Sequence, residues 1–329
     1  YEDLTTDHLT ITDYLTNGQN KVAFQGKTYN FDYSNDLLEN LVGAGAANYP
    51  ISFFTNPTVV AGEEFHGSFL SEKITGTGSD DVIYGGAGDD NITAKAGNDT
   101  VYGGDGNDVI YGTSGTNTIY GGAGHDNISG GSGDDTIYGD DGNDTISSGN
   151  GNDVIYGGAG DDKINANLHA KNATETKEIH GGEGNDTITV GTNYAGNFTY
   201  NIHGDEGEDT IVVNGNNGNV NLIDADSSDI LKHGTVSGAE YSYTRDGQDL
   251  VITQTVGSNI QTMRTENHFD RYAEGNQLDK FVIGTEETSL LENATINVDL
   301  TNVITTSKAP YEATDYKEVY TLTSDKTVY

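Results

Sequence analysis

An aliphatic residue recurs at every ninth position through the middle of the chain. From Gly76 to Asn165, ten nine-residue copies follow one another without an insertion, and the eighth place of every copy is Ile or Val. Two further copies begin at Gly181 and Gly204, after spacers. The surrounding places are mostly polar or Gly. A fixed period of this kind is typical of a repeat architecture, in which each unit contacts mainly its neighbours.

Each copy is expected to combine a turn with a short strand. Its first six places are rich in Gly, Asp and Asn, which favour tight turns because Gly adopts positive φ without steric cost. Its last three places form a strand whose middle, aliphatic residue points inward. One copy then makes half a coil, so copies n and n+2 stack on the same side, about 4.8 Å apart. The pattern predicts an all-β spiral with two sheets and a thin core between them.

The charge of the chain indicates that this spiral needs cations. The 329 residues include 15 Lys and Arg against 52 Asp and Glu, a formal net charge of −37, and only 33% are hydrophobic. A double row of Ile and Val is too thin to offset chain entropy, and the acidic surplus pushes a compact state apart. Nucleic acid and anionic membrane surfaces would be repelled. There is no Cys for disulfides or thiolate metal sites, and no apolar run long enough to span a membrane.

The turns offer ligands for a hard cation. The sixth place is Asp in every copy but one, and the Gly-rich turn presents backbone carbonyls. Ca²⁺ takes six to eight oxygen ligands, which two turns stacked at n and n+2 can supply together. The predicted aspartate ligands are Asp81, Asp90, Asp99, Asp108, Asp126, Asp135, Asp144, Asp153, Asp162, Asp186 and Asp209. The predicted turn glycines are Gly85, Gly86, Gly88, Gly103, Gly104, Gly106, Gly121, Gly122, Gly124, Gly130, Gly131, Gly133, Gly157, Gly158 and Gly160.

Departures from the repeat weaken one edge of the spiral. The ten regular copies give about eight internal sites, within six to ten calcium ions for the chain. Asn117 replaces the aspartate in one copy and serves two of the eight pairs, which predicts two weak sites. Ala94 and Lys95 replace the first two glycines of another copy on the same edge. The alternative, ordinary Asx turns in a Gly-rich linker, does not require an aliphatic residue at every ninth place.

Tyrosines occupy the ninth place of every second copy. Because alternate copies share a sheet, all five are expected on one sheet: Tyr84, Tyr102, Tyr120, Tyr138 and Tyr156. Two interpretations remain open, a self-stacking ladder that stiffens the sheet and a face covered by a flanking segment or a partner. His125, in a fifth place, and His180 and His203, each just before the first Gly of a copy, are expected to serve turns rather than to bind a metal.

The tandem motif GGxGxDxUx resembles the repeat of the RTX (repeats-in-toxin) family of haemolysin-type proteins. The resemblance is strict over residues 76–165 and looser to about residue 212. It implies a right-handed parallel β-roll stabilised by Ca²⁺, with β-rich flanking segments. It also implies export by a type I secretion apparatus of a Gram-negative bacterium, and folding in the calcium-rich medium outside the cell.

The flanks divide into further expected regions. Residues 1–40 resemble the end of an upstream capping segment, 41–75 read as a connector, and 166–232 hold irregular repeats whose inserts at 166–178 and 190–203 are expected to leave the coil as loops or hairpins. Residues 233–288 resemble the β-rich capping segment that follows haemolysin repeats. Residues 289–329 form a tail that can contain a secretion signal. Asp224, Asp226 and Asp229 can hold a terminal ion.

These observations favour a non-enzymatic, calcium-binding module of a larger secreted toxin or adhesin. The motifs HExxH and GxSxG, typical of proteases and lipases with such repeats, do not occur in the sequence. A catalytic domain elsewhere in the parent protein stays open. The alternative hypothesis is a module that itself binds a glycan, a cell-surface partner or an S-layer through its tyrosine-lined sheet.

Overall fold

The computed structural model describes residues 64–167, 173–192, 194–225, 228–234 and 236–268. It also describes Val59, Ala61 and the short strands at 21–24, 27–30, 280–283, 286–289, 295–299 and 317–321. Every regular element among these residues is a strand, as the repeat predicts. None of them forms a helix long and apolar enough to cross a membrane.

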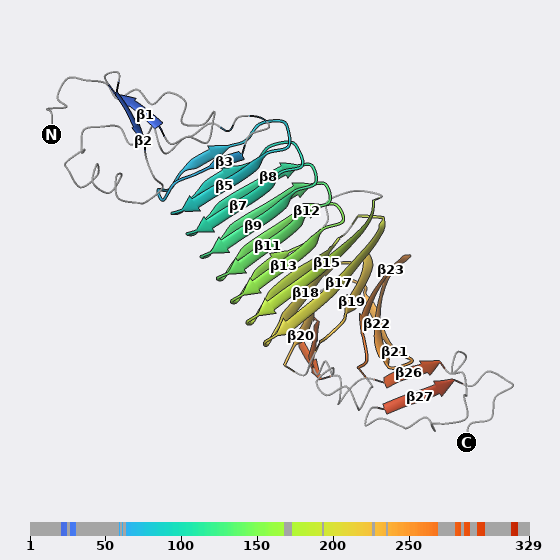
Figure 1. The fold of residues 1–329 in the computed structure, drawn as a ribbon. Helices are drawn as coiled ribbons and strands as arrows, with labels where there is room; N and C mark the ends of the chain where they lie inside the picture. Colours follow the sequence, from blue (N-terminus) through green and yellow to red (C-terminus); the bar gives the residue numbers. More distant parts are fainter. Residues whose placement is uncertain are drawn as a thin grey trace, which may run out of the picture.

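Two long sheets face each other along the molecule and make a parallel β-roll (Figure 1). Sheet 1 contains, in chain order, β3 (Glu64–His66), β5 (Val82–Ala87), β7 (Thr100–Asp105), β9 (Thr118–Ala123), β11 (Thr136–Asp141), β13 (Val154–Ala159), β15 (Thr174–Glu183), β17 (Asn197–Glu206), β19 (Gly218–Leu222), β21 (Glu240–Asp246), β22 (Asp249–Val256), β23 (Asn259–Thr265), β26 (Thr295–Asp299) and β27 (Lys317–Thr321). Sheet 2 contains β4 (Lys73–Thr75), β6 (Asn91–Thr93), β8 (Val109–Ser114), β10 (Asn127–Ser132), β12 (Thr145–Asn150), β14 (Lys163–Asn165), β16 (Thr187–Thr192), β18 (Thr210–Gly215), β20 (Ile230–His233), β24 (Lys280–Ile283) and β25 (Glu286–Ser289). A separate hairpin joins β1 (Lys21–Phe24) and β2 (Lys27–Asn30).

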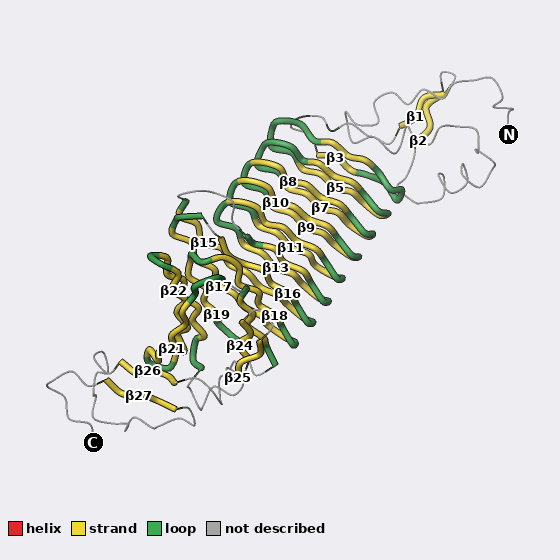
Figure 2. The backbone as a smooth tube through the Cα atoms, turned by 180° about the vertical axis from the view of Figure 1, so that it is seen from behind, coloured by secondary structure: helices red, strands yellow, loops and turns green. Residues whose placement is uncertain are grey.

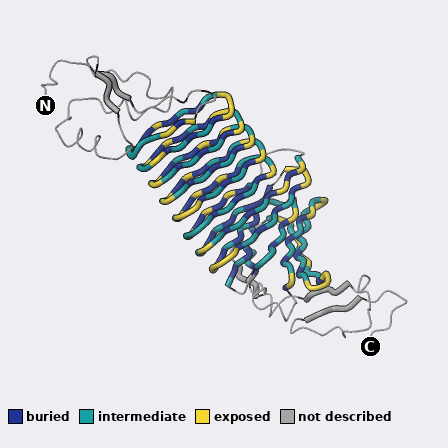
Figure 3. Tube along the Cα trace, in the orientation of Figure 1, coloured by how far each residue is buried: buried dark blue, intermediate teal, exposed yellow. Residues whose placement is uncertain are grey.

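The register confirms that two copies make one coil. In the regular part, neighbouring strands of a sheet are parallel and pair residues 18 positions apart, such as Ile83 with Val101 and Ile137 with Ile155. The eighth-place side chains of the ten copies are buried to within 1% of full burial and form the core between the sheets. Figure 3 shows this buried stripe inside the roll, with exposed residues at the turns. The core is thus one aliphatic side chain thick on each side.

The strands are longer than the repeat predicts. In eight of the ten regular copies they span six residues, from the seventh place of one copy to the third place of the next, rather than three; only β6 and β14 have three residues. The difference arises because the first three places continue the parallel ladder, pairing Gly86 with Gly104 and Ala87 with Asp105. Gly104 sits at a φ of 117°, which turns the chain without ending the pairing. The turn proper is therefore confined to the fourth to sixth places (Figure 2).

The roll begins before Gly76, where a connector was expected. Strand β3 pairs in parallel with β5 and β4 with β6, and Phe65 and Ile74 are buried in the core. These two residues lie 18 and nine positions before Ile83, at eighth places of copies whose other places have lost the motif. The buried eighth-place residue therefore continues further toward the N-terminus than the Gly- and Asp-rich turn motif does.

The spacers between the later copies lengthen strands instead of leaving the coil. Strands β15 and β17 have ten residues each and pair in parallel from Thr174↔Asn197 to Glu183↔Glu206. The expectation of loops is wrong for residues 174–178 and 197–203, because these segments alternate and bury Phe198 and Tyr200 in a wider core. Residues 168–172 and 193 lie outside the described part of the chain.

The sheet changes character near its C-terminal end. Strands β21, β22 and β23 form an antiparallel meander, with turns at Gly247 (φ 68°) and Gly257 (φ 63°), and β23 pairs in parallel with β19. The chain turns at Asp246-Gly247, a dipeptide that favours a tight hairpin turn. Figures 1 and 2 both place this meander beside the last coils of the roll.

Candidate calcium-binding turns

Buried carboxylates line both edges of the roll. We call the two edges after one member of each. The Asn117 edge carries the sixth-place residues Asp81, Asp99, Asn117, Asp135 and Asp153. The Asp108 edge carries Asp90, Asp108, Asp126, Asp144, Asp162, Asp186, Asp209 and Asp229. All are at most 3% exposed. The predicted ligands thus lie in two continuous rows.

One oxygen of each carboxylate links neighbouring turns. Asp108 Oδ1 accepts a hydrogen bond from the backbone N–H of Asp90 at 2.7 Å, and Asp126 Oδ1 accepts one from Asp108 at the same distance. The same contact joins Asp209 Oδ1 to Asp186 N–H and Asp229 Oδ1 to Asp209 N–H. Each aspartate is therefore fixed against the coil before it, through a bond that does not use its second oxygen.

The second oxygen is unpaired in nine of these side chains. Each is buried and has no hydrogen-bond partner within the described part of the chain: Asp90, Asp99, Asp108, Asp126, Asp135, Asp144, Asp162, Asp186 and Asp209, at Oδ2. Two other aspartates of the rows have a partner at Oδ2. Asp81 Oδ2 accepts the N–H of Thr77 at 2.6 Å, and Asp153 Oδ2 is paired with a lysine. A buried ionised carboxylate without a partner costs several kcal/mol, so this row of oxygens favours a cation beside it.

Burial perturbs the acidity of the row. Loss of hydration raises the pKa of these carboxyls from 3.8, and neighbouring carboxylates add to the effect, while the bond to the preceding N–H opposes it. The pKa is raised to about 7 for Asp90, Asp135, Asp162 and Asp209. It is raised to about 6 for Asp99, Asp108, Asp126, Asp144 and Asp186. Without a cation, the folded roll therefore keeps protons at these sites up to a higher pH than the unfolded chain does.

The predicted glycines let backbone oxygens approach these carboxylates. A Cβ at the first-place Gly103 would lie 2.4 Å from both Asp108 Oδ2 and the Gly121 carbonyl oxygen. At the second and fourth places, Gly104 and Gly106 adopt φ of 117° and 140°, and their added Cβ atoms would lie 1.9 and 2.3 Å from the carbonyl oxygens of the coil before. The same three places hold the other predicted glycines: Gly85, Gly121, Gly130 and Gly157 (first), Gly86, Gly122, Gly131 and Gly158 (second), and Gly88, Gly124, Gly133 and Gly160 (fourth).

A lysine ammonium occupies one of these turns. Lys177 is fully buried, and its Nζ donates to the carbonyl oxygens of Gly149 at 2.9 Å and Gly151 at 3.1 Å, and to Ser148 Oγ at 3.0 Å. It also forms an ion pair with Asp153 Oδ2. In the copy 148–156 these partners are the first, second, fourth and sixth places. The second- and fourth-place carbonyls and the sixth-place Oδ2 of a turn therefore converge on a single cation.

Lys177 reaches this turn from the sixth place of the next coil. Glu178 pairs with Val154 across β13 and β15, which sets Lys177 beside Asp153 in register. A base thus stands where the repeat would have its next aspartate. The sequence analysis missed Lys177, because it expected residues 166–178 to leave the coil. Once this spacer is placed in the coil, Lys177 falls in a sixth place of the repeat.

The Asn117 edge is modified at a second position. Asn117 Nδ2 donates to Asp135 Oδ1 at 3.0 Å and to the Gly115 carbonyl at 3.4 Å. An amide donor therefore contacts a fourth-place carbonyl of its own turn, in the role that the ammonium has in the copy 148–156. Lys95 and Thr113 hold second places of this edge at positive φ, 82° and 80°. These features support the prediction that the Asn117 edge is the weaker ladder.

The sequence analysis missed Glu72 at one end of the Asp108 edge, and it named Asp229, at the other end, only as a candidate ligand for a terminal ion. Glu72 stands in the sixth place of the degenerate copy before Gly76, and its N–H donates to Asp90 Oδ1 at 2.7 Å. Asp229 continues the row beyond Asp209. Asp224 lies elsewhere, accepting the N–H of Gly204 at 3.0 Å, and Asp226 is outside the described residues. The signal for Glu72 and Asp229 is the aliphatic residue two positions after each.

The five predicted tyrosines lie on sheet 1 and stack on one another. Successive rings are nearly parallel, with centroids 4.7–5.0 Å apart. His66 extends this ladder at one end, and His180 and His203 extend it at the other. His125 instead accepts the N–H of Asn143 through Nδ1 at 2.7 Å, a turn contact as expected. The ladder therefore has histidines at both ends, which the sequence analysis did not predict. The turn role expected for His180 and His203 is wrong, because both residues lie within strands, β15 and β17, and stack in the ladder.

Comparison with protein families agrees with this geometry. The RTX calcium-binding nonapeptide repeat matches four times, at residues 66–101, 102–137, 138–168 and 178–192. The β-roll is built of RTX calcium-binding repeats. The first match begins at His66, which agrees with the early start of the roll. No curated protein compared with the chain is significantly similar to it. The RTX repeat is a calcium-binding, structural unit rather than a catalytic domain.

Proposed function

We propose that this chain is a calcium-gated folding module of a larger secreted protein, either a toxin or an adhesin. In this proposal Ca²⁺ lies between stacked turns, beside the unpaired Oδ2 atoms, with carbonyls of the second and fourth places as further ligands. The observation that carries it is the Lys177 ammonium, because it is a cation held by those oxygens in one turn. The nine unpaired oxygens correspond to about nine ions, seven of them on the Asp108 edge.

Gating follows from the electrostatics of the turns. At neutral pH without calcium, the unfolded chain keeps its carboxylates hydrated and far apart, whereas folding buries them in rows. An ion bound between two turns offsets that cost, and its free energy of binding contributes directly to folding. Because each interior aspartate bonds to the coil before it, binding at one turn favours stacking of the next. We therefore expect a cooperative transition.

The gate suits export of an unfolded chain. A type I secretion apparatus passes unfolded protein, and the chain stays unfolded in a calcium-poor cytosol and folds in the extracellular medium. RTX repeats are typical of secreted proteins, which supports an extracellular or cell-surface location. In this proposal residues 233–288 cap the last coil, supported by the β21–β23 meander against β19, and residues 289–329 contain the export signal.

The tyrosine ladder favours a structural role over glycan binding. Each inner ring has a neighbour stacked on both faces at 4.7–5.0 Å. A sugar that binds by stacking needs a free aromatic face, and these faces are covered by the ladder itself. We therefore assign the row to stiffening sheet 1.

A calcium titration tests the proposed function. The chain is freed of metal with a chelator and titrated with Ca²⁺ while far-UV circular dichroism is recorded, with Mg²⁺ as the matched control. We expect a cooperative coil-to-β transition with Ca²⁺ and none with Mg²⁺, which demands an octahedral site at shorter distances. A chain that is fully β-structured in chelator at neutral pH would contradict the gate.

A further inference from the structure

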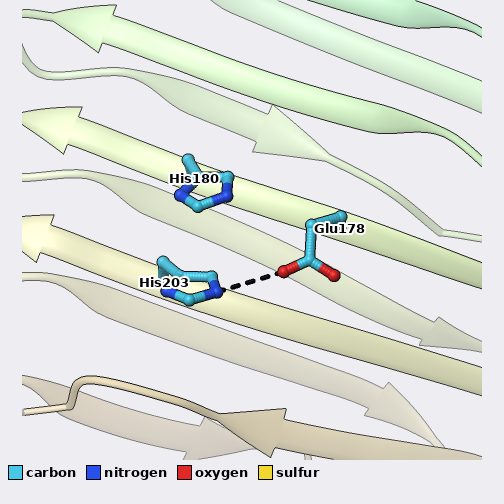
Figure 4. Close-up of side chains that lie close together, drawn as sticks. All are labelled: Glu178, His180 and His203. Carbon is cyan, nitrogen blue, oxygen red and sulfur yellow. Dashed lines mark hydrogen bonds and ion pairs between the residues drawn. The ribbon is translucent and has the colours of Figure 1, made fainter.

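Two histidines end the tyrosine ladder inside a group of carboxylates. His180 and His203 are register partners on the neighbouring strands β15 and β17, and their rings stack with centroids 4.3 Å apart and planes 12° apart. Glu178 lies two residues before His180, so both side chains are on the same face of the sheet. Figure 4 shows the glutamate beside the two rings, with one nitrogen of each ring on its side.

The three side chains bring their ligand atoms close together. His203 Nε2 lies 3.1 Å from Glu178 Oε1, and one ligand atom from each of the three residues lies within 4.8 Å of the others. A tetrahedral zinc ion with bonds of about 2.0–2.2 Å holds its ligands about 3.3–3.6 Å apart. Rotation of the half-buried side chains, which turns the two rings out of their stack, closes that difference.

The outer contacts of the histidines orient them as metal ligands. His180 Nδ1 lies 3.4 Å from Asp205 Oδ2, and His203 Nδ1 lies 3.4 Å from Asp224 Oδ2. A carboxylate on Nδ1 fixes the tautomer with the proton there and leaves the Nε2 lone pair for a metal. Two histidines have this arrangement side by side.

Glu178 is oriented in the same way. Its Oε2 accepts a hydrogen bond from Asn201 Nδ2 at 2.9 Å, and Asn201 Oδ1 in turn accepts one from Asn221 Nδ2 at 2.9 Å. The other oxygen, Oε1, is directed to His203. The amides of Asn201 on β17 and Asn221 on β19 thus hold the carboxylate in a defined orientation.

We infer that Glu178, His180 and His203 form a binding site for a divalent transition metal such as Zn²⁺, separate from the calcium turns. Two imidazoles and one carboxylate suit Zn²⁺ rather than Ca²⁺, which prefers oxygen ligands only. Three carboxylates around two histidines give the site a negative charge that a divalent cation offsets. The ring nitrogens point nearly parallel in the stack, so binding turns the rings toward a common ion. Metal binding therefore ends the ladder at Tyr156.

The site offers a clear set of variants. His180→Gln and His203→Gln each remove a ligand, and Asp224→Asn removes an orienting carboxylate. His66→Gln is the matched control, because His66 stacks on Tyr84 at the opposite end of the ladder and lies 3.5 Å from a glutamate, and among the described residues no second histidine stacks on it.

Zinc titration calorimetry in saturating millimolar calcium tests the inference, since calcium then occupies the turns and Zn²⁺ alone is the probe. We expect one Zn²⁺ per chain. Either ligand variant should weaken binding at least a hundredfold, Asp224→Asn about 10–100-fold, and His66→Gln not at all. Circular dichroism of each variant shows whether the roll has formed, and Glu178→Gln serves if a histidine variant does not fold.

Cobalt substitution provides a second measurement. Co²⁺ bound by two imidazoles and a carboxylate in a tetrahedral site gives intense visible absorption, which should vanish in His203→Gln. Wild-type protein that folds with calcium but binds no Zn²⁺, or variants that bind it as tightly as wild type, would overturn the metal site. These results would leave the calcium proposal unaffected, because that is judged by the folding transition.

Discussion

The substitution Lys177→Ala compares the stabilising effect of a cation that belongs to the chain, the Lys177 ammonium, with that of a calcium ion bound from solution. The side chains of Lys177 and Asp153 are both fully buried, and the ammonium also contacts Ser148 and the carbonyls of Gly149 and Gly151. Removing one partner of a buried ion pair costs about 3–5 kcal/mol, because the other charge stays buried alone. We expect this loss in the free energy of unfolding at a calcium concentration just sufficient to fold the wild type.

The same substitution opens the turn to calcium. If the vacated oxygens bind Ca²⁺, the variant gains one ion in its folded state. Its stability then rises relative to wild type by about 1.4 kcal/mol for each tenfold increase in free calcium above the dissociation constant of that site. The gap measured at low calcium should therefore narrow by about 3 kcal/mol over a hundredfold rise.

Urea unfolding at a series of free calcium concentrations measures this gap, and calorimetric titration counts the ions. Lys163→Ala is the control, because Lys163 is exposed in β14 and its loss should change stability by less than about 0.5 kcal/mol. A gap that stays constant across calcium concentrations, together with an unchanged ion count, would refute the equivalence of the ammonium and the calcium ion.

Three further predictions follow from the turns. First, the raised pKa values mean that the folded roll without calcium holds more protons than the unfolded chain between about pH 4 and pH 7, so its stability falls as pH rises through that window. The chelated chain should therefore gain β structure on acidification from pH 7 to pH 5. A circular dichroism signal that stays flat or changes in the opposite direction would count against the buried rows of carboxylates. Second, Gly106→Ala should cost about 1–3 kcal/mol in thermal or urea unfolding, because Gly106 has a φ of 140° and faces the Gly88 carbonyl. Gly78→Ala, at a third place with open space around it, should be nearly neutral, and equal losses in the two variants would rule out the steric argument. Third, Asn117→Asp should raise the number of bound calcium ions, since it restores the missing carboxylate of the Asn117 edge. An unchanged number of ions per chain in calorimetry would show that another feature limits calcium binding at that edge.

Much of the roll could be predicted from single residue types. The eighth-place aliphatic and the sixth-place aspartate set the coil length, the register and the two rows of carboxylates, because each place has one steric or chemical requirement. Tyrosine occupies the ninth place of every second copy, and this alternation predicted that the five tyrosines share one sheet. These features depend only on neighbours 18 residues apart, so the local pattern contains them.

The features that the sequence analysis missed involve a changed residue in an unchanged position. Phe65 and Ile74 keep the core place after the Gly and Asp motif has disappeared, so a search by motif starts the roll too late. Lys177 takes the place of an aspartate with the opposite charge, behind a spacer that looked like a loop. The histidines of the ladder became neighbours only because β15 and β17 pair in register across spacers of different sequence.

A crystal structure of the calcium-loaded chain, with calcium located by anomalous scattering, tests the central claim most directly. We predict ions between stacked turns beside Oδ2 of the nine unpaired aspartates, concentrated on the Asp108 edge, with Lys177 still paired to Asp153. Ions bound only at the exposed fifth-place carboxylates, or a calcium ion that displaces Lys177 from Asp153, would contradict the account.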